Sequence, residues 1–543
     1  MNELLVVVTA LAVSILVIPA MMRLAPRLGM IDVPDVRKVH ARPVPRVGGF
    51  GIALGALAAL LVIGPEGAWI RFYVAGALVL LVFGALDDSR EMGHYTKFVG
   101  QFLAVIPIVW FGDVWVSSFP FLSAPLPEAI GKPFTAMAIV GVINAINHSD
   151  GLDGLAAGVS ALSLGCCAYL ANLTGDVTLV VLCLAVLGGL FGFLRFNTHP
   201  ASVFMGDAGS QFLGFSLGTF AVVLTQQSNS SVSMALPLLM LGIPVIDILA
   251  VFYLRVSGRM NWFRATRNHI HHRLLDLGFE QYRAVVLIYA MQTFFVICAI
   301  VFRHESDMLM LALYAIPCAL LFAALSAAER FGWRGKRLAT DSFASRSFSP
   351  APPAGADRRV VAAVACAVPA YFLAGALSVR ALPEGAGLAL TALLAALVPA
   401  VLFPRRAWSA VPAKVAVYAL APLSVYAVER QLTSIAPGVL VASTLFYGLL
   451  AVAVALAWKF SRDQDFAPTT MDFLIAVFAV TASMFSADFG GGASLAGLLV
   501  KVVILLYACE LVFSRAGRRA REALPLAALA SVLLALVSGT ATA

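Results

Sequence analysis

Long apolar segments follow one another along almost the whole chain, and short polar segments separate them. Most of them approach or exceed the roughly 20 apolar residues that a helix needs to cross a bilayer. About eighteen candidate spans can be counted: 4–24, 48–64, 71–86, 97–111, 133–148, 152–172, 177–194, 210–226, 234–254, 284–302, 308–326, 360–379, 387–403, 411–429, 435–457, 471–487, 493–513 and 524–540. The pattern predicts an all-α polytopic membrane protein with about 18 transmembrane helices.

The composition agrees with this class, because 61% of the 543 residues are hydrophobic and only 12% are charged. Water-soluble domains carry roughly 25% charged residues. If the N-terminus is outside and the spans alternate, the inner loops hold nearly all of the 37 Lys and Arg residues, as the positive-inside rule expects. The net charge of +8 therefore reflects orientation in the bilayer and attraction to anionic lipid, and we predict no nucleic-acid partner.

A stretch rich in Ser, Pro, Ala and Arg, residues 330–359, interrupts the series of apolar segments. Such a composition is typical of a flexible linker, here on the cytoplasmic side. It divides the chain into a core of eleven spans, residues 1–329, and a C-terminal extension of seven spans, residues 360–543. The extension has few motif-like polar residues, and the sequence does not indicate its role.

Acidic residues recur where the apolar segments of the first part end. Asp87 and Asp88 follow the third span, Asp150 and Asp153 lie in NAINHSDGLDG after the fifth, and Asp207 lies in FMGDAGS after the seventh. Alternation places them all on the cytoplasmic face. Adjacent carboxylates repel each other unless a cation or proton shares the site, and Mg²⁺ usually takes one or two carboxylates plus substrate phosphates. The pattern favours Mg²⁺ and phosphate chemistry, with solvated or helix-capping Asp residues as the alternative.

Cationic and amide side chains accompany these acids. Lys97 follows the first Asp pair, and Asn144 and Asn147 share the helical spacing that puts two side chains on one face. Lys38 and His40 lie in DVPDVRKVHARPVPRVGGFG, the loop between the first two spans. These residues are candidates for binding an anionic substrate, although a positive-inside loop explains the charges of the last two equally well.

Three histidines, His269, His271 and His272, precede Arg273 in RNHIHHRLLDLG. Their spacing differs from that of an HExxH zinc site, and no Cys lies nearby. Histidine and arginine donate hydrogen bonds to phosphate oxygens, so the cluster suits a diphosphate, with a merely basic loop beside the membrane as the alternative. Asp247 is an ionisable residue within an apolar segment and is therefore a further functional candidate.

A membrane transporter is the alternative from a different functional class. Transporters place their binding residues near the bilayer midplane, whereas the acidic residues of this chain gather at the ends of spans in loops that contain glycine. The pattern favours an enzyme that acts at the membrane surface.

Five stretches together resemble the polyprenyl-phosphate N-acetylhexosamine-1-phosphate transferases of glycosyltransferase family 4. In the family's order they are DVPDVRKVHARPVPRVGG, LDDSREMGHYTKFVGQ, NAINHSDGLDGLAAG, FMGDAGS and HIHHRL, within residues 1–330. The resemblance implies ten or eleven transmembrane helices and a cytoplasmic active site in a bacterial plasma membrane. It implies a Mg²⁺-dependent transfer, with Mn²⁺ as an alternative, of a sugar 1-phosphate from a UDP-sugar to undecaprenyl phosphate with release of UMP.

The same resemblance implies partners and residue roles. HIHHRL resembles the branch that uses a UDP-N-acetylhexosamine, such as UDP-GlcNAc, to start a cell-envelope polysaccharide, rather than the phospho-N-acetylmuramoyl-pentapeptide branch. A homodimer is compatible with it. By position, Asp87 or Asp88 would deprotonate or orient the lipid phosphate, and Asp207, with Asp88, would bind the metal. The nucleotide and metal would be positioned by Asp150, Asp153 and Asn147. The diphosphate or sugar would be held by His269, His271, His272 and Arg273.

Overall fold

The computed structural model describes residues 2–34, 42–65, 67–90, 92–122, 124–228, 232–258, 268–333, 356–378, 386–404, 407–432, 437–459, 470, 474–475 and 495–540. Apart from a short antiparallel pair, β1 (Ile31–Asp32) with β2 (Val44–Pro45), the regular elements are helices. Within these residues, ten helices are long and apolar enough to cross a membrane. The all-α polytopic class is confirmed, whereas the count of 18 spans is not.

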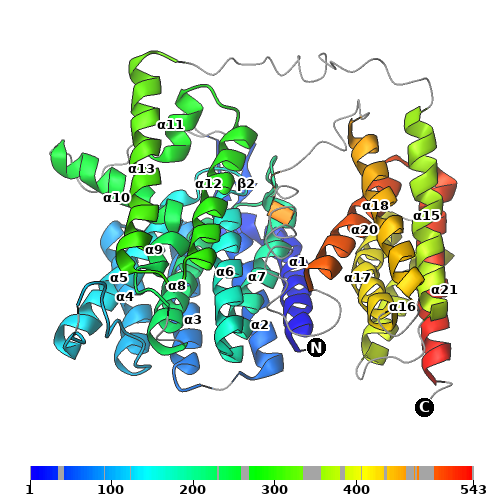
Figure 1. The fold of residues 1–543 in the computed structure, drawn as a ribbon, viewed down its shortest axis with the longest axis horizontal. Helices are drawn as coiled ribbons and strands as arrows, with labels where there is room; N and C mark the ends of the chain where they lie inside the picture. Colours follow the sequence, from blue (N-terminus) through cyan, green and yellow to red (C-terminus); the bar gives the residue numbers. More distant parts are fainter. Residues whose placement is uncertain are drawn as a thin grey trace. The chain divides into compact units, whose positions relative to one another are not determined.

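The chain divides into two compact units. Unit 1 comprises Met1–Arg337 and Thr469–Leu474, and unit 2 comprises Leu338–Pro468 and Ile475–Ala543. The helices of unit 1 are α1 (Asn2–Leu28), α2 (Gly48–Ile63), α3 (Ile70–Arg90), α4 (His94–Trp110), α5 (Glu128–Ser149), α6 (Leu155–Thr174), α7 (Val177–Asn197), α8 (Gly206–Val223), α9 (Leu236–Met240), α10 (Gly242–Ser257), α11 (Ile270–Asp276), α12 (Gln281–Val301) and α13 (Asp307–Arg330), with a π-helical turn, η1 (Leu224–Ser228) (Figure 1).

Helix α8 lies at the centre of unit 1. Every residue from Ala208 to Val223 is buried, and α2, α3 and α5 pack against the helix. Small residues permit this close packing: a Cβ at Gly49 would lie 2.2 Å from the backbone nitrogen of Gly209, and one at Gly214 would lie 2.4 Å from the Cα of Ile143. The N-terminus of α8, which carries Asp207, is therefore held among its neighbours.

The apolar segment 234–254, expected as one span, forms two helices instead. Helix α9 ends at Met240 and α10 begins at Gly242, and Pro244 lies in the first turn of α10. Proline cannot donate the hydrogen bond that a continuous helix would require and fits best in a first turn. At the break, a Cβ at Gly242 would lie 2.6 Å from Cδ2 of Phe295 in α12, so the chain turns where only glycine fits.

Unit 2 is a helical bundle with its own apolar core. Its helices are α15 (Ala356–Ser378), α16 (Ala386–Leu402), α17 (Ala407–Leu432), α18 (Pro437–Lys459), α20 (Leu495–Arg515) and α21 (Arg518–Thr540). Helix α15 contacts α17, α18, α20 and α21, and fully buried residues such as Phe372, Val417 and Leu511 belong to one continuous cluster. This core accounts for the compactness of unit 2 without any contribution from unit 1.

Candidate active site

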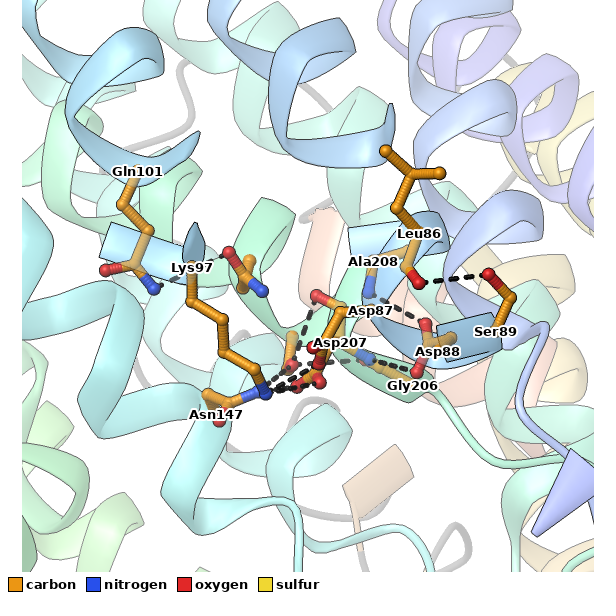
Figure 2. A network of polar contacts seen from close by, with 12 residues as sticks. Leu86, Asp87, Asp88, Ser89, Lys97, Gln101, Asn147, Gly206, Asp207 and Ala208 are labelled. Atoms are coloured by element: carbon orange, nitrogen blue, oxygen red, sulfur yellow. Dashed lines mark hydrogen bonds and ion pairs between the residues drawn. The ribbon is translucent and has the colours of Figure 1, made fainter. Parts of the chain in front are cut away.

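Asp88 holds the end of α3 against the beginning of α8. Its two carboxylate oxygens accept backbone N–H groups from Asp207 at 2.9 Å and from Ala208 at 3.1 Å (Figure 2). The first N–H groups of a helix have no partner within it, and the helix dipole favours a negative charge there. Asp88 is only 5% exposed. Both of its oxygens are therefore engaged in joining two helices, which leaves Asp87 as the member of the pair that faces the rest of the site.

Two glycines make this junction possible. Gly206 has a φ of +74°, and a Cβ at this position would lie 2.5 Å from Oδ2 of Asp88. A Cβ at Gly84, one turn before Asp88 in α3, would lie 2.3 Å from the Cα of Ala208. The glycine in FMGDAGS thus permits both the turn into α8 and the close approach of the Asp88 carboxylate.

Lys97, in the first turn of α4, bridges two carboxylates. Its Nζ lies 2.6 Å from Oδ2 of Asp87 and 2.9 Å from Oδ2 of Asp207. Asp87 is 4% exposed, and its other oxygen, Oδ1, is buried without a hydrogen-bond partner among the described residues. Figure 2 shows the three side chains converging from α3, α4 and α8. One ammonium group thus balances part of the negative charge of two carboxylates.

The two asparagines of α5 have different surroundings. The Nδ2 of Asn147 donates to Oδ1 of Asp207 and, at 2.8 Å, to Oγ of Ser210. Asn144 lies one turn deeper and donates to Oε1 of Gln101 at 2.9 Å, so it joins α5 to α4. The structure therefore brings Asn147 to the carboxylate cluster, whereas Asn144 supports the helices beneath it.

The two acids of the DGLDG turn, Asp150 and Asp153, interact with different parts of the protein. Burial raises the pKa of Asp150 to about 7, and the negative charges of Asp207 and Asp153 add to this effect. Asp153 instead binds the segment after α7, because its Oδ2 lies 2.7 Å from Nδ1 of His199 and accepts from the backbone N–H of Ala201 at 3.1 Å. Asp150 is thus the acid of the turn that interacts with the carboxylate cluster.

Two residues that hold this turn were missed by sequence reasoning. Asn197 Oδ1 accepts the N–H of Gly154 at 2.9 Å, and the hydroxyl of Tyr289 donates to the carbonyl of Gly154 at 2.6 Å. Gly154 has a φ of +79°. Asn197 is the last residue of α7, two positions after Arg195, and nothing in that pattern separates it from an ordinary polar residue at a helix end.

Asp247 orients the histidine segment. Its Oδ2 lies 2.8 Å from Nδ1 of His269, and its Oδ1 accepts the backbone N–H of Ile270 at 2.7 Å. Both side chains are buried. A carboxylate on Nδ1 fixes the orientation of an imidazole and directs Nε2 to the opposite side. The rings of His148 and His271 lie beside that of His269, with centroids 5.3 Å and 5.7 Å away. His148, within NAINHSDGLDG, was not predicted as a site residue.

His271 joins the histidine segment to the DGLDG turn. A Cβ at Gly151 would lie only 2.2 Å from Nε2 of His271, so the ring lies against the glycine backbone. Burial lowers the pKa of His271 to about 3, with the neighbouring His272 contributing. The ring of His272 is 4.2 Å from that of His271. At neutral pH, His271 is therefore an uncharged group that can exchange hydrogen bonds.

Arg273 is engaged by α13. Its Nε and Nη2 donate to the two carboxylate oxygens of Glu329 at 2.7 Å and 2.9 Å. Such a bidentate pair is directional and comparatively strong. The structure therefore places Arg273 beside the histidines but turned to a partner within the protein.

The loop between α1 and α2 lies along the approach to α8. Phe204 donates its N–H to the carbonyl of Pro45 at 2.8 Å, and the N–H of Gly49 donates to the carbonyl of Met205 at 2.8 Å. Arg46 forms an ion pair with Asp32. The candidates Lys38 and His40 lie outside the described residues, so the structure places only the flanks of their loop next to FMGDAGS.

Comparisons with known proteins identify the family of this chain. Residues 70–225 match the sequence model of glycosyl transferase family 4. A Bacillus subtilis (strain 168) protein, named a probable undecaprenyl-phosphate N-acetylglucosaminyl 1-phosphate transferase, is 35% identical over 323 residues, which cover 58% of this chain and 90% of the relative. The chain belongs to glycosyl transferase family 4. Its part matching the family contains α3 to α8 and hence all five acids of the predicted site, whereas the histidine segment and unit 2 lie beyond it.

Two further relatives in this family cover about half of the chain. An undecaprenyl-phosphate alpha-N-acetylglucosaminyl 1-phosphate transferase of Yersinia pestis is 31% identical over 274 residues, 49% of this chain and 75% of the relative. A decaprenyl-phosphate N-acetylglucosaminephosphotransferase of Mycobacterium leprae (strain TN) is 33% identical over 298 residues, again 49% and 75%. The three relatives are all named for transfer of an N-acetylglucosamine phosphate to a polyprenyl phosphate.

The contact of Gly206 with Asp88 predicts the effect of adding a methyl group. Gly206→Ala should lower the free energy of unfolding by about 1–3 kcal/mol more than Gly64→Ala does, because overpacking adds to the backbone strain. Gly64 is a matched control: its φ is +59°, and a Cβ there would meet nothing within 4 Å. Denaturation of the purified variants in detergent measures the difference. Equal losses would show that the Asp88 contact does not constrain position 206.

The raised pKa of Asp150 predicts a pH-dependent difference from Asp150→Asn. The pKa of Asp150 is about 7 in the folded protein, whereas its usual value is 3.8. Binding of this proton therefore stabilises the folded state. The stabilisation is complete below the usual pKa and is lost as the pH rises through 7. In magnesium-free buffer, the Tm of the variant should therefore rise relative to the wild type between pH 5 and about pH 8. A constant difference across that range would contradict the assignment.

Proposed function

We propose that this protein transfers N-acetylglucosamine 1-phosphate from UDP-N-acetylglucosamine to undecaprenyl phosphate, releases UMP and so starts a cell-envelope polysaccharide. The observation that carries the proposal is the junction of Asp87, Lys97 and Asp207 at the N-terminus of α8, in a chain whose relatives are named for this class of reaction. Those names favour this donor over a muramoyl-pentapeptide donor. The site also lies at helix ends, which favours an enzyme over a transporter.

We further propose that the site faces the cytoplasm of a bacterial plasma membrane. The loops at this end of unit 1 carry most of its Lys and Arg residues, and the positive-inside rule assigns such loops to the cytoplasmic side. UDP-sugars are made in the cytoplasm, so this orientation gives the donor direct access. The acceptor phosphate would reach the same surface from the inner leaflet.

The side chains at this junction fit a Mg²⁺ ion. Asp87 and Asp207 already converge on one cation, the Nζ of Lys97, and Asp87 Oδ1 is buried without a partner among the described residues. In the described part of the chain, no group of three or more His, Cys, Asp and Glu residues is arranged to hold a metal. Mg²⁺ commonly binds through one or two carboxylates together with substrate phosphates, so Asp207 and the substrate phosphates would hold the ion and Asp87 stays available as a base. Asp88, which the sequence also offered as a ligand, has both oxygens engaged by the backbone of α8. When bound, the metal would offset charge on the two phosphate-bearing substrates.

The chain's own residues then have distinct tasks. Asp87 accepts the remaining proton of the lipid phosphate, whose oxygen attacks the β-phosphorus of the UDP-sugar. A P–O bond forms there as the bond from the β-phosphorus to the oxygen of UMP breaks. Lys97 offsets negative charge beside the reacting groups, and Asn147 holds Asp207 in place. We favour direct attack over an aspartyl-phosphate intermediate, because the lipid phosphate is already a competent nucleophile.

The histidine segment would hold the diphosphate of the donor. Asp247 fixes His269, and His271 lies against Gly151 at the DGLDG turn. These imidazoles can donate hydrogen bonds to phosphate oxygens without a permanent charge. The donor would therefore lie between the histidines and the carboxylate cluster, with its β-phosphorus toward Asp87.

The reaction itself is tested by UMP release from UDP-N-acetylglucosamine by the full-length protein in detergent. We expect release to require both undecaprenyl phosphate and Mg²⁺, and Asp87→Asn and Asp207→Asn each to lower kcat by about 10²- to 10⁴-fold. Asp113→Asn is the matched control, because Asp113 is an exposed residue of the loop between α4 and α5. UMP release without lipid, or full activity of either site variant, would refute the proposal.

The orienting contact of Asp247 predicts a separate effect. Asp247→Asn keeps an acceptor for the N–H of Ile270 but can place an amide N–H against Nδ1 of His269, which favours the other tautomer. We expect kcat to fall about 10- to 100-fold and the nitrogen NMR shifts of His269 to report the tautomer change. A loss of activity with an unchanged tautomer would show that Asp247 acts in some other way.

A further inference from the structure

Unit 2 contains two ion pairs between the antiparallel helices α17 and α20. Lys414 lies 2.8 Å from Glu510, and Lys501 lies 2.7 Å from Glu429. The first pair is partly exposed, with side-chain exposures of 31% and 38%, whereas those of Lys501 and Glu429 are 13% and 5%. The apolar segments 411–429 and 493–513, which overlap these two helices, are predicted from the sequence to cross the membrane. Burying a charge within such a helix is expensive, and such residues commonly mark functional sites. The Lys501–Glu429 pair therefore requires an explanation beyond packing.

Glu429 and Lys501 differ in how many of their hydrogen-bonding groups have partners. Glu429 accepts from Ser443 through Oε1 at 2.9 Å and from Lys501 through Oε2, so both carboxylate oxygens are engaged. An ammonium group has three N–H donors, and among the described residues the only acceptor of Lys501 is Glu429. The same ammonium lies 5.6 Å from the ring centroid of Tyr447. The groups of this pair that still lack a hydrogen-bond partner among the described residues are therefore N–H donors of Lys501.

Two tyrosine hydroxyls next to the pair add to this unused capacity. Tyr447 is only 2% exposed, and its Oη and that of Tyr371 are buried without a hydrogen bond of normal geometry to a described residue. The two hydroxyls are close enough to interact with each other, and that of Tyr371 with Ser424. The two rings are in edge contact, with centroids 5.7 Å apart. A buried hydroxyl without a partner is costly, and such groups usually have one. Lys501, Tyr447 and Tyr371 together therefore have more N–H and O–H donors than the described acceptors around them engage with normal geometry.

The depth of the site suggests where the acceptor comes from. Lys501 lies six residues into α20, about 9 Å from its first turn at the helical rise of 1.5 Å per residue, and Glu429 lies three residues before the end of α17. This depth is near the boundary between lipid headgroups and hydrocarbon. Arg515 and Arg518 lie at the opposite end of the bundle, so the positive-inside rule assigns the site to the outward half of unit 2.

We propose that Lys501, Tyr447 and Tyr371 bind the singly charged phosphodiester of a membrane lipid in the outward half of unit 2. Phosphate oxygens supply the acceptors that these donors lack. Glu429 already neutralises Lys501, so one additional negative charge is easier to accommodate than the two of a phosphate monoester. The ammonium of Lys501 would then bridge two anions, as the ammonium of Lys97 bridges Asp87 and Asp207 in unit 1.

The test is a titration of the full-length protein in detergent with phosphatidylglycerol, followed by native mass spectrometry. We expect Tyr447→Phe to weaken binding about tenfold, as the loss of one charge-assisted hydrogen bond predicts. Its Tm without added lipid should stay unchanged or rise, because the variant loses an unsatisfied hydroxyl. Tyr418→Phe is the matched control, since Tyr418 bonds to Glu510 in the other ion pair, and its binding should equal that of the wild type.

A double variant and two further ligands complete the test. Glu429→Gln with Lys501→Met removes both charges but keeps the side-chain volumes, and it should abolish specific binding while the protein stays folded. Diacylglycerol, which has the same chains without the phosphodiester, should not bind. Binding of inorganic phosphate with the same dependence on Tyr447 would identify a soluble anion as the source of the same chemistry. Equal affinities of the wild type, Tyr447→Phe and the double variant would overturn the proposal.

Discussion

The contact on which the site depends is that between the Asp88 carboxylate and the N-terminus of α8. The Asp88 oxygens accept two backbone N–H groups that the helix cannot satisfy itself. Inside this tightly packed bundle the alternative is a set of buried polar groups without partners. The neighbouring positions follow from this contact. Asp87 precedes Asp88 and Asp207 donates one of the two N–H groups, so fixing Asp88 also sets the two carboxylates that Lys97 joins.

This arrangement leaves an excess of negative charge that one lysine does not remove. Asp87 and Asp207 share Lys97, and burial, together with the negative charges of Asp207 and Asp153, raises the pKa of Asp150 to about 7. A substrate phosphate would add further negative charge to the same place, and only additional cations can make its approach favourable. A metal between the acids and the phosphates would offset this charge, which gives the proposed Mg²⁺ an electrostatic reason independent of resemblance.

Much of this site could be predicted from the ends of the apolar segments, because alternation of spans brings Asp87, Asn147 and Asp207 to one side before any contact is known. Which of Asp87 and Asp88 faces the site could not be predicted from the sequence, because it depends on which of the two contacts the backbone of α8. For the same reason the roles of Asn197 and Glu329 were missed: each binds a residue more than forty positions away. The two helices in 234–254 depend on a close contact between Gly242 and Phe295, which hydrophobicity does not record.

The histidine segment would orient a bound diphosphate through hydrogen bonds more than attract it through positive charge. The low pKa of His271, about 3, leaves it neutral, His269 is oriented by the carboxylate of Asp247, and the guanidinium of Arg273 is paired with Glu329. A diphosphate bound there would gain hydrogen bonds but little net positive charge from these three residues. Lys97 and the proposed metal would supply positive charge at the carboxylate end, and Arg255 is close enough to His148 to act on it electrostatically at the histidine end. In the proposed reaction, Lys97 and the metal would attract the negative charge of the donor toward Asp87, where the lipid phosphate would attack, while the histidines would set its orientation.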